Sequence, residues 1–206
     1  MNLDKYKNDG WGISEEGFKK ILEVLNLIKF TKFEIYNILE FGSGISTQFF
    51  VDYIDEHNLK NVQITSFENE IQYMTKVTHC QLDLKMRNLV TCNDNDYTEM
   101  FNLKQYDSYK FNELTSKPTT RQKNCFYNIE AVDIPISIDF MLLDGPNGNG
   151  RNIAYLHTQN KLHDGSIVFI DDYNHYDFLE KFGCFHKYEI VFERPESHSF
   201  IIIKLL

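Results

Sequence analysis

The stretch Glu40-Phe41-Gly42-Ser43-Gly44-Ile45-Ser46-Thr47 decides the fold class of this chain. It begins in the last two residues of a compact apolar run at 35–41, which is typical of a buried strand. It leads into a helical stretch that ends near His57. Its two glycines have no Cβ, so the chain can turn sharply there and a ligand can contact the backbone. The sequence therefore predicts a strand, a ligand-binding turn and a helix.

Strands and helices alternate on both sides of this unit. Ser14 can cap a helix that extends to about residue 28, after a polar lead-in. The later expected strands are 62–67, 89–92, 138–143, 166–170, 188–193 and 200–205, and the expected helices are 71–79, 151–162 and a short one ending near Gly183. This alternation predicts a mainly parallel sheet with helices on both faces, closed by two antiparallel strands joined through Pro195.

One domain suits the length of 206 residues, with an N-terminal lead-in and helix at 1–34. Residues 95–135 are the least regular part, rich in Tyr, Asn, Lys and Thr, and we expect a lid or substrate segment there. The formal charge of −9 and the pI near 5.2 make nucleic acid an unlikely partner. The four scattered cysteines and the lack of a long apolar segment favour a cytoplasmic protein that does not enter a membrane.

Two carboxylates favour one cofactor class over another. Glu68 ends the second strand, where a carboxylate can accept hydrogen bonds from a ribose diol. Dinucleotides need a third glycine, and Thr47 stands at that place. Glu40 precedes the turn, and its charge opposes a pyrophosphate but suits a cationic sulfonium and its ammonium group. The loop therefore fits S-adenosylmethionine better than NAD.

Residues 40–47 resemble motif I of class I methyltransferases, and Ser66-Phe67-Glu68 is similar to the acidic end of their second strand. The resemblance covers 35–206 in the order of elements. It implies an α/β, three-layer Rossmann-like methyltransferase fold, with a mostly parallel seven-stranded sheet and an antiparallel C-terminal strand. It places Glu40 near the methionine moiety, Glu68 on the ribose and Asn93 or Asp94 near the adenine. The cofactor-binding residues implied are Glu40, Gly42, Ser43, Gly44, Ser46, Glu68, Asp94 and Asp144.

Three aspartates follow two neighbouring predicted strands. Asp144 comes after the run 140–143, and Asp171 and Asp172 come after the run 167–170. Converging carboxylates share protons or bind a hard cation such as Mg²⁺, which would lower the pKa of a substrate hydroxyl. Residues 165–173 resemble the paired-aspartate segment of metal-dependent macrolide-sugar O-methyltransferases, and Asp144-Gly145-Pro146 with Arg151 resembles glycan methyltransferases such as the plant glucuronoxylan enzymes. Both resemblances imply O-methylation of a sugar or small hydroxylated molecule.

Asp144, His175 and Arg151 are the candidate catalytic residues. The ordinary pKa of histidine suits His175 to a general base, and Arg151 could hold an anionic substrate group. Aromatic side chains could line the substrate pocket, and the candidates are Trp11, Tyr97, Tyr106, Tyr109 and Tyr127. Two other functions stay open, a non-catalytic scaffold subunit and a nicotinamide-dependent oxidoreductase, and a homo-oligomer is conceivable.

Overall fold

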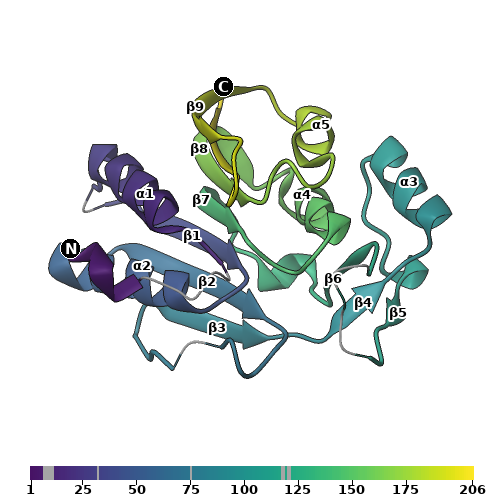
Figure 1. Cartoon of the computed structure of the whole chain (residues 1–206), viewed down its shortest axis with the longest axis horizontal. Helices are drawn as coiled ribbons and strands as arrows, with labels where there is room; N and C mark the ends of the chain where they lie inside the picture. The colour runs from purple at the N-terminus through teal and green to yellow at the C-terminus, as the bar shows by residue number, and fades with distance from the viewer. Residues whose placement is uncertain (7–11, 32, 75, 117–118, 120–121) are drawn as a thin grey trace.

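The central sheet has seven strands in the order β3-β2-β1-β7-β8-β10-β9 (Figure 1). The strands are β1 (Tyr36–Phe41), β2 (Val62–Glu68), β3 (Leu82–Met86), β7 (Ile138–Leu143), β8 (Leu162–Asp171), β9 (Tyr188–Arg194) and β10 (Phe200–Leu205). Parallel pairing joins β3, β2, β1, β7 and β8, and β10 is antiparallel to both of its neighbours. The predicted mostly parallel sheet with an antiparallel C-terminal strand is therefore confirmed.

This computed structural model describes residues 1–6, 12–31, 33–74, 76–116, 119 and 122–206. Its α-helices are α1 (Glu15–Leu27), α2 (Ile45–Glu56), α3 (Asp94–Leu103), α4 (Ile153–Thr158) and α5 (Phe178–Gly183). The predicted cap of α1 is confirmed, because the Ser14 hydroxyl accepts a hydrogen bond from the Gly17 N–H at 3.1 Å. No helix of the described residues has the length and apolar character needed to cross a bilayer.

The sheet is buried on both faces, which gives three layers. On one face, alternate strand residues such as Ile38, Phe140 and Phe169 pack against α1 and α2. On the other face, residues such as Leu39 and Met141 pack against α3, α4 and α5. Burial on both faces explains why the inner strands are continuous apolar runs rather than alternating ones.

A second, three-stranded antiparallel sheet lies beside the first, in the order β5-β4-β6 (Figure 1). Its strands are β4 (Leu89–Thr91), β5 (Asn112–Glu113) and β6 (Cys125–Tyr127). Two of our expectations are wrong here. The third strand of the main sheet is β3, whereas the expected strand at 89–92 belongs to this small sheet. Residues 95–135 are more regular than expected, because they hold α3, β5 and β6.

The expected helix at 71–79 is also wrong: its described residues form turns and irregular chain. The expected helix at 151–162 is shorter, with a 3₁₀ turn (Asn149–Asn152) leading into α4. Both of these segments connect one strand to the next, and a connection between strands can be made without a full-length helix. The helix ending at Gly183 is confirmed as α5.

Candidate functional site

The loops after β1 and β7 are in direct contact at the carboxyl end of the parallel strands. The Phe41 carbonyl accepts hydrogen bonds from the N–H groups of Asp144 and Gly145, at 2.9 and 2.7 Å. Gly42 has a φ of +97°, and a Cβ on it would lie 2.9 Å from the Gly145 nitrogen. Only glycine meets both demands, the positive φ and the close approach. The two loops that carry the candidate residues thus form one unit.

Gly44 begins α2 in a backbone conformation that L side chains rarely adopt, with φ +150° and ψ −127°. Its N–H donates to the Thr47 hydroxyl at 3.1 Å, which closes the first turn of the helix. The Ser43 hydroxyl between the two glycines is buried and has no hydrogen-bond partner. A buried hydroxyl without a partner is costly, and a bound ligand could satisfy it.

Glu40 is fully buried beneath this loop. Its Oε2 accepts hydrogen bonds from the hydroxyls of Thr47 and Ser66, at 2.6 and 2.5 Å, whereas its Oε1 has no hydrogen-bond partner. Burial raises the pKa of Glu40 to about 7, although the hydroxyls of Ser46, Ser66 and Thr47 lower it. The sequence did not predict that Thr47 and Ser66 would donate hydrogen bonds to Glu40. Little in the sequence signals these contacts, because Ser66 is one of several polar residues in β2.

Glu68 ends β2 beside the same loop and is 5% exposed. Its Oε1 accepts hydrogen bonds from the N–H groups of Asn69 and Glu70, at 2.7 and 2.8 Å, which fix the carboxylate at the strand end. Burial raises its pKa, and these N–H groups oppose the rise. Its charge also adds to the raised pKa of Glu40. Two carboxylates thus give the end of β1 and β2 a negative potential.

A hollow of about 570 Å³ opens where the chain leaves Glu68. One wall is the segment 69–72, which includes the exposed Ile71, and the other is the edge of the small sheet, with Leu89 and Leu114. Its volume lies within the range of small-molecule sites, about 300–1,000 Å³. The small sheet therefore supplies a wall that the main sheet alone would lack.

Asp144, Asp171 and Arg151 meet at the ends of β7 and β8. The buried Arg151 donates from Nε to the Pro146 carbonyl at 2.9 Å and from Nη1 to the Asp171 carbonyl at 2.8 Å. Its Nη2 lies 3.7 Å from Asp144 Oδ1. The Asp144 and Asp171 carboxyl groups lie close enough to affect each other's titration. Burial raises the pKa of both carboxyl groups, and Arg151 opposes the rise. The charge of Asp171 raises the pKa of Asp144 further, whereas the contact with Asp144 lowers the pKa of Asp171.

Arg151 was expected to hold a substrate anion, but in the structure its side chain binds the protein's own backbone. Its guanidinium is turned inward, 4% exposed, and ties the loop after β7 to the end of β8. Sequence reasoning missed this because an arginine in a first helical turn is usually solvated. The arrangement makes Arg151 the counter-charge of the aspartate pair.

Asp172 lies near enough for its charge to raise the pKa of Asp144 and of Asp171, but its own carboxylate faces a histidine. It adopts a φ of +55°, and its carboxylate lies 3.7 Å from His175 Nδ1. His175 is largely exposed. No cluster of three or more His, Cys, Asp or Glu side chains suited to a metal ion occurs among the described residues. The expected metal ligands Asp144, Asp171 and Asp172 do not form such a cluster, because the Arg151 guanidinium lies between the first two and the third lies beside His175.

Asp94 was placed near the adenine because it follows residues 89–92, and that premise fails since those residues are not in the main sheet. Its Oδ1 accepts a hydrogen bond from Asn124 Nδ2 at 2.9 Å, and it opens α3 after the cap residue Asn93. This polar contact ties α3 to β6. The structure therefore gives Asp94 a role in holding the small sheet.

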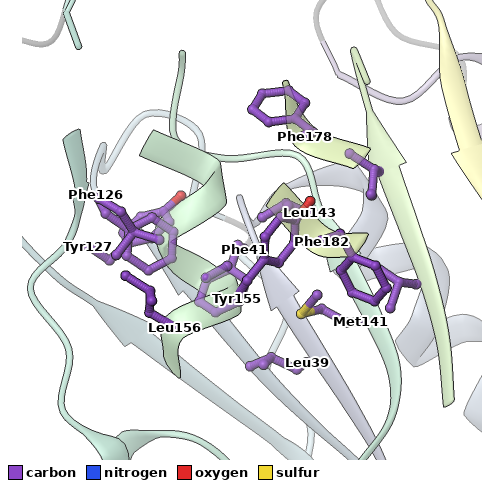
Figure 2. Packing of buried hydrophobic residues seen from close by; sticks show 14 of the residues in the cluster. Leu39, Phe41, Phe126, Tyr127, Met141, Leu143, Tyr155, Leu156, Phe178 and Phe182 are labelled. Carbon is purple, nitrogen blue, oxygen red and sulfur yellow. The ribbon is translucent and has the colours of Figure 1, made fainter. Parts of the chain in front are cut away.

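The aromatic candidates are dispersed. Tyr127 is buried at the site: its ring stacks on Phe41 at 6.0 Å, and a Cβ on Gly145 would lie 2.3 Å from its hydroxyl. Figure 2 shows Tyr127 and Phe41 within one buried cluster with Leu143. Tyr97 and Tyr106 pack into the side of the molecule that holds α3, Tyr109 is 97% exposed, and Trp11 lies outside the described residues. Of the candidates that the structure describes, Tyr127 is therefore the one that adjoins both loops.

No family model matches the sequence, and no curated protein sequence matches it either. Solved structures do resemble the chain. The precorrin-6y C5,15-methyltransferase of Geobacter metallireducens GS-15 aligns with a TM-score of 0.54 and 12% identity, over 98% of this chain and 94% of that protein. A putative O-methyltransferase from Klebsiella pneumoniae has a TM-score of 0.50 and 10% identity, over 98% and 86%.

Human methyltransferase-like protein 13, solved in complex with SAH, also has a TM-score of 0.50, with 9% identity over 92% of this chain and 82% of that protein. At identities this low the similarity shows the fold alone. The shared fold agrees with the observed strand order and with the position of the glycine loop at the end of β1.

Proposed function

We propose, from the class I methyltransferase fold that this chain has, that it is an S-adenosylmethionine-dependent methyltransferase. The observation that carries the proposal is the buried Glu40 under the loop 42–44, with Glu40 Oε1 and the Ser43 hydroxyl both lacking a partner. When bound, the cofactor supplies an electrophilic methyl group on a cationic sulfur. The residues of the loop bind and orient it.

The negative potential at this loop favours a cationic cofactor. Glu40 and Glu68 lie at the ends of adjacent strands that pair in parallel, and the charge of Glu68 raises the pKa of Glu40. A nearby positive charge stabilises the ionised form of such carboxylates, and a pyrophosphate opposes it. NAD would also lack the third glycine, since Thr47 is occupied in holding Glu40. The nicotinamide alternative is therefore disfavoured.

The hollow beside Glu68 suits the adenosine part of the cofactor. A ribose placed against Glu68 would direct its base between segment 69–72 and the small sheet, where Ile71 and Leu89 offer apolar surface. Ile71 is 82% exposed, so its side chain is accessible to a base placed in the hollow.

We further propose a hydroxyl of a sugar or another small molecule as the methyl acceptor. The support is the segment Asp144-Gly145-Pro146 with Arg151, and a carboxyl pair that can accept a proton from a hydroxyl group. His175, exposed beside Asp172, is the second candidate for the base. A divalent metal is not part of the proposal, because Arg151 already balances the aspartate pair.

The cofactor assignment is tested by calorimetric titration of the purified chain with S-adenosylhomocysteine, S-adenosylmethionine and NADH. We expect the first two to bind and NADH not to bind. Glu68→Gln should weaken binding at least about tenfold, because a hydrogen bond to a charged acceptor is lost. Glu189→Gln on the edge strand β9 is the matched control and should bind normally. Absence of binding at millimolar ligand would sink the proposal.

The acceptor class is tested separately, by release of S-adenosylhomocysteine in the presence of hydroxylated sugars, phenols and amines. Turnover with hydroxyl acceptors that persists after thorough chelation supports the proposal as stated. Turnover with amines alone would overturn the acceptor class and leave the cofactor assignment standing. Cofactor binding without turnover on a broad panel would favour the scaffold alternative.

A further inference from the structure

A second hollow, of about 720 Å³, lies at the amino-terminal edge of the sheet, where β1 and β2 begin. This edge is opposite the glycine loop, because parallel strands carry all their amino ends together. Aromatic and aliphatic side chains form much of its lining, including Phe30, Tyr36, Leu59 and Val62. The Phe30 and Tyr36 rings pack edge to face at 5.0 Å, which gives the hollow a defined apolar wall. The hollow is too far from Glu40 and Glu68 along β1 and β2 to belong to the proposed cofactor site.

Apolar side chains stand exposed beside this hollow. Phe33 is 98% exposed and Ile35 63% exposed, in the segment that leads into β1. A phenylalanine with almost no contact to its own chain is unusual in a protein that buries most of its phenylalanines. Aromatic side chains that enter a pocket are the typical anchors of protein interfaces. The molecule thus carries a projecting ring and, on the same face, a hollow whose lining is partly apolar.

The charges of the hollow suit a second copy of this chain. Its charged lining residues are two lysines, Lys29 and Lys60, and two acids, Glu34 and Asp139. Neither lysine forms an ion pair with a described residue, whereas Asp139 is engaged by the Asn37 N–H at 2.7 Å and by His163 at 3.3 Å. A twofold interface brings a patch against itself and so needs both signs of charge on that patch. The rest of this chain, with a net charge of −9, would repel its own copy.

We propose that two copies of the chain associate about a twofold axis through this face, with Phe33 of each copy inserted into the hollow of the other. Lys60 and Lys29 then come within reach of Glu34 of the opposite copy. The glycine loop of each copy stays open, because it lies at the other edge of the sheet. The dimer therefore does not depend on the proposed cofactor.

Sedimentation velocity from low micromolar to several hundred micromolar tests this interface. We expect the wild type to dimerise with increasing concentration, and Phe33→Ser to weaken the dimer at least thirtyfold, by about the amount typical of an interface anchor. Tyr109→Ser is the matched control, because Tyr109 is an aromatic side chain of similar exposure, 97%, away from the hollow. It should dimerise as the wild type does. A wild type that is monomeric throughout, or a Phe33→Ser variant that dimerises normally, would overturn the proposal.

Charge reversal supplies a second measurement that does not depend on Phe33. Lys60→Glu should weaken the dimer, and adding Glu34→Lys should restore it, since the two changes exchange the charges of a pair that spans the axis. Failure of the second change to restore association would overturn the pairing. All these variants should bind S-adenosylhomocysteine as the wild type does, so a failure of the cofactor assignment is recognised independently. Circular dichroism confirms that each variant is folded.

Discussion

The two edges of the central sheet depart from ordinary burial in opposite ways. At the carboxyl edge, charged groups lie inside: Glu40 is fully buried, Arg151 is 4% exposed and Asp171 6% exposed. At the amino edge, large apolar groups lie outside, as Phe33 at 98% and Ile136 at 94% show. A buried charge and an exposed apolar ring each raise the free energy of the isolated chain. The difference agrees with the two proposals, which put a charged ligand at one edge and an apolar contact at the other.

The largest effect is expected when the counter-charge of the carboxyl edge is removed. Arg151→Met leaves the buried Asp171 and the partly buried Asp144 without a cation, and it should lower the free energy of unfolding by about 4 kcal/mol at pH 8. At pH 5 the loss should be smaller. The folded-state pKa values of both aspartates are already raised by burial and would rise further, so protonation relieves the unpaired charge at low pH.

Urea unfolding at the two pH values measures this difference. Arg194→Met is the control, because Arg194 pairs with Glu16 at the surface, at 2.6 Å, and should cost less than about 1 kcal/mol. An equal loss for Arg151→Met at pH 5 and pH 8 would mean that its hydrogen bonds to the carbonyls, and not its charge, hold the edge together.

The next effect comes from packing at the same edge. A Cβ on Gly145 would lie 2.3 Å from the Tyr127 hydroxyl and 2.9 Å from Gly42 Cα, so Gly145→Ala should cost about 3 kcal/mol and separate the two loops. Gly165, in the amino-terminal part of β8, has a φ of +90° and open space around it. Gly165→Ala should therefore cost only about 1 kcal/mol, from backbone strain. Urea unfolding of the two variants compares the edges directly, and equal losses would contradict the contact between the loops.

Local patterns made the main features of the fold predictable. The glycine loop directly follows the apolar run of β1, and Glu68 is the last residue of β2, so each strand end follows from short-range signals. The edge strand β3 was missed because Leu82–Met86 alternates apolar and charged residues, as a half-exposed strand does, while the nearby run at 89–92 is more apolar. The small sheet depends on pairing between β4 and β6, more than thirty residues apart, which no local pattern encodes.

The candidate site was predictable only in part, for a related reason. The residue types at the strand ends were visible, and the structure brings Asp144 and Asp171 together. Their partner Arg151 was visible too, but its burial depends on the carbonyls of Pro146 and Asp171, which only the folded loops bring within reach. Likewise, Thr47 and Ser66 can both donate hydrogen bonds to Glu40 only when β1, β2 and α2 have come together.

A smaller effect should appear in the pH dependence of cofactor binding. The pKa of Glu40 is about 7 without ligand, and its ionised form favours a cation, so S-adenosylmethionine affinity should rise by up to about tenfold from pH 6 to pH 8. Glu40→Gln should bind more weakly at pH 8 and lose this pH dependence. Calorimetry at several pH values measures both. An unchanged pH dependence in Glu40→Gln would assign the titration to another group, with Glu68 as the next candidate.

Glu40→Gln should also separate stability from binding. A carboxyl group whose folded-state pKa is raised contributes stability that is present below its ordinary pKa, near 4.5, and is lost as the pH rises through about 7. The variant removes that loss, so at pH 8 without ligand it should unfold at the same or a higher urea concentration than the wild type. A clear destabilisation would mean that the carboxylate stabilises the loop instead of serving a ligand.

The smallest effect is expected at the amino edge. Ile136 is 94% exposed just before β7, whereas Ile138, two residues later, is fully buried. Ile136→Ser should change the free energy of unfolding by no more than about 0.5 kcal/mol, while Ile138→Ala should cost about 3 kcal/mol. Urea unfolding at low protein concentration, where self-association is weak, compares them. If Ile136→Ser were clearly destabilising, this edge would use its exposed apolar groups for folding, and a contact with a second copy would no longer be needed to explain them.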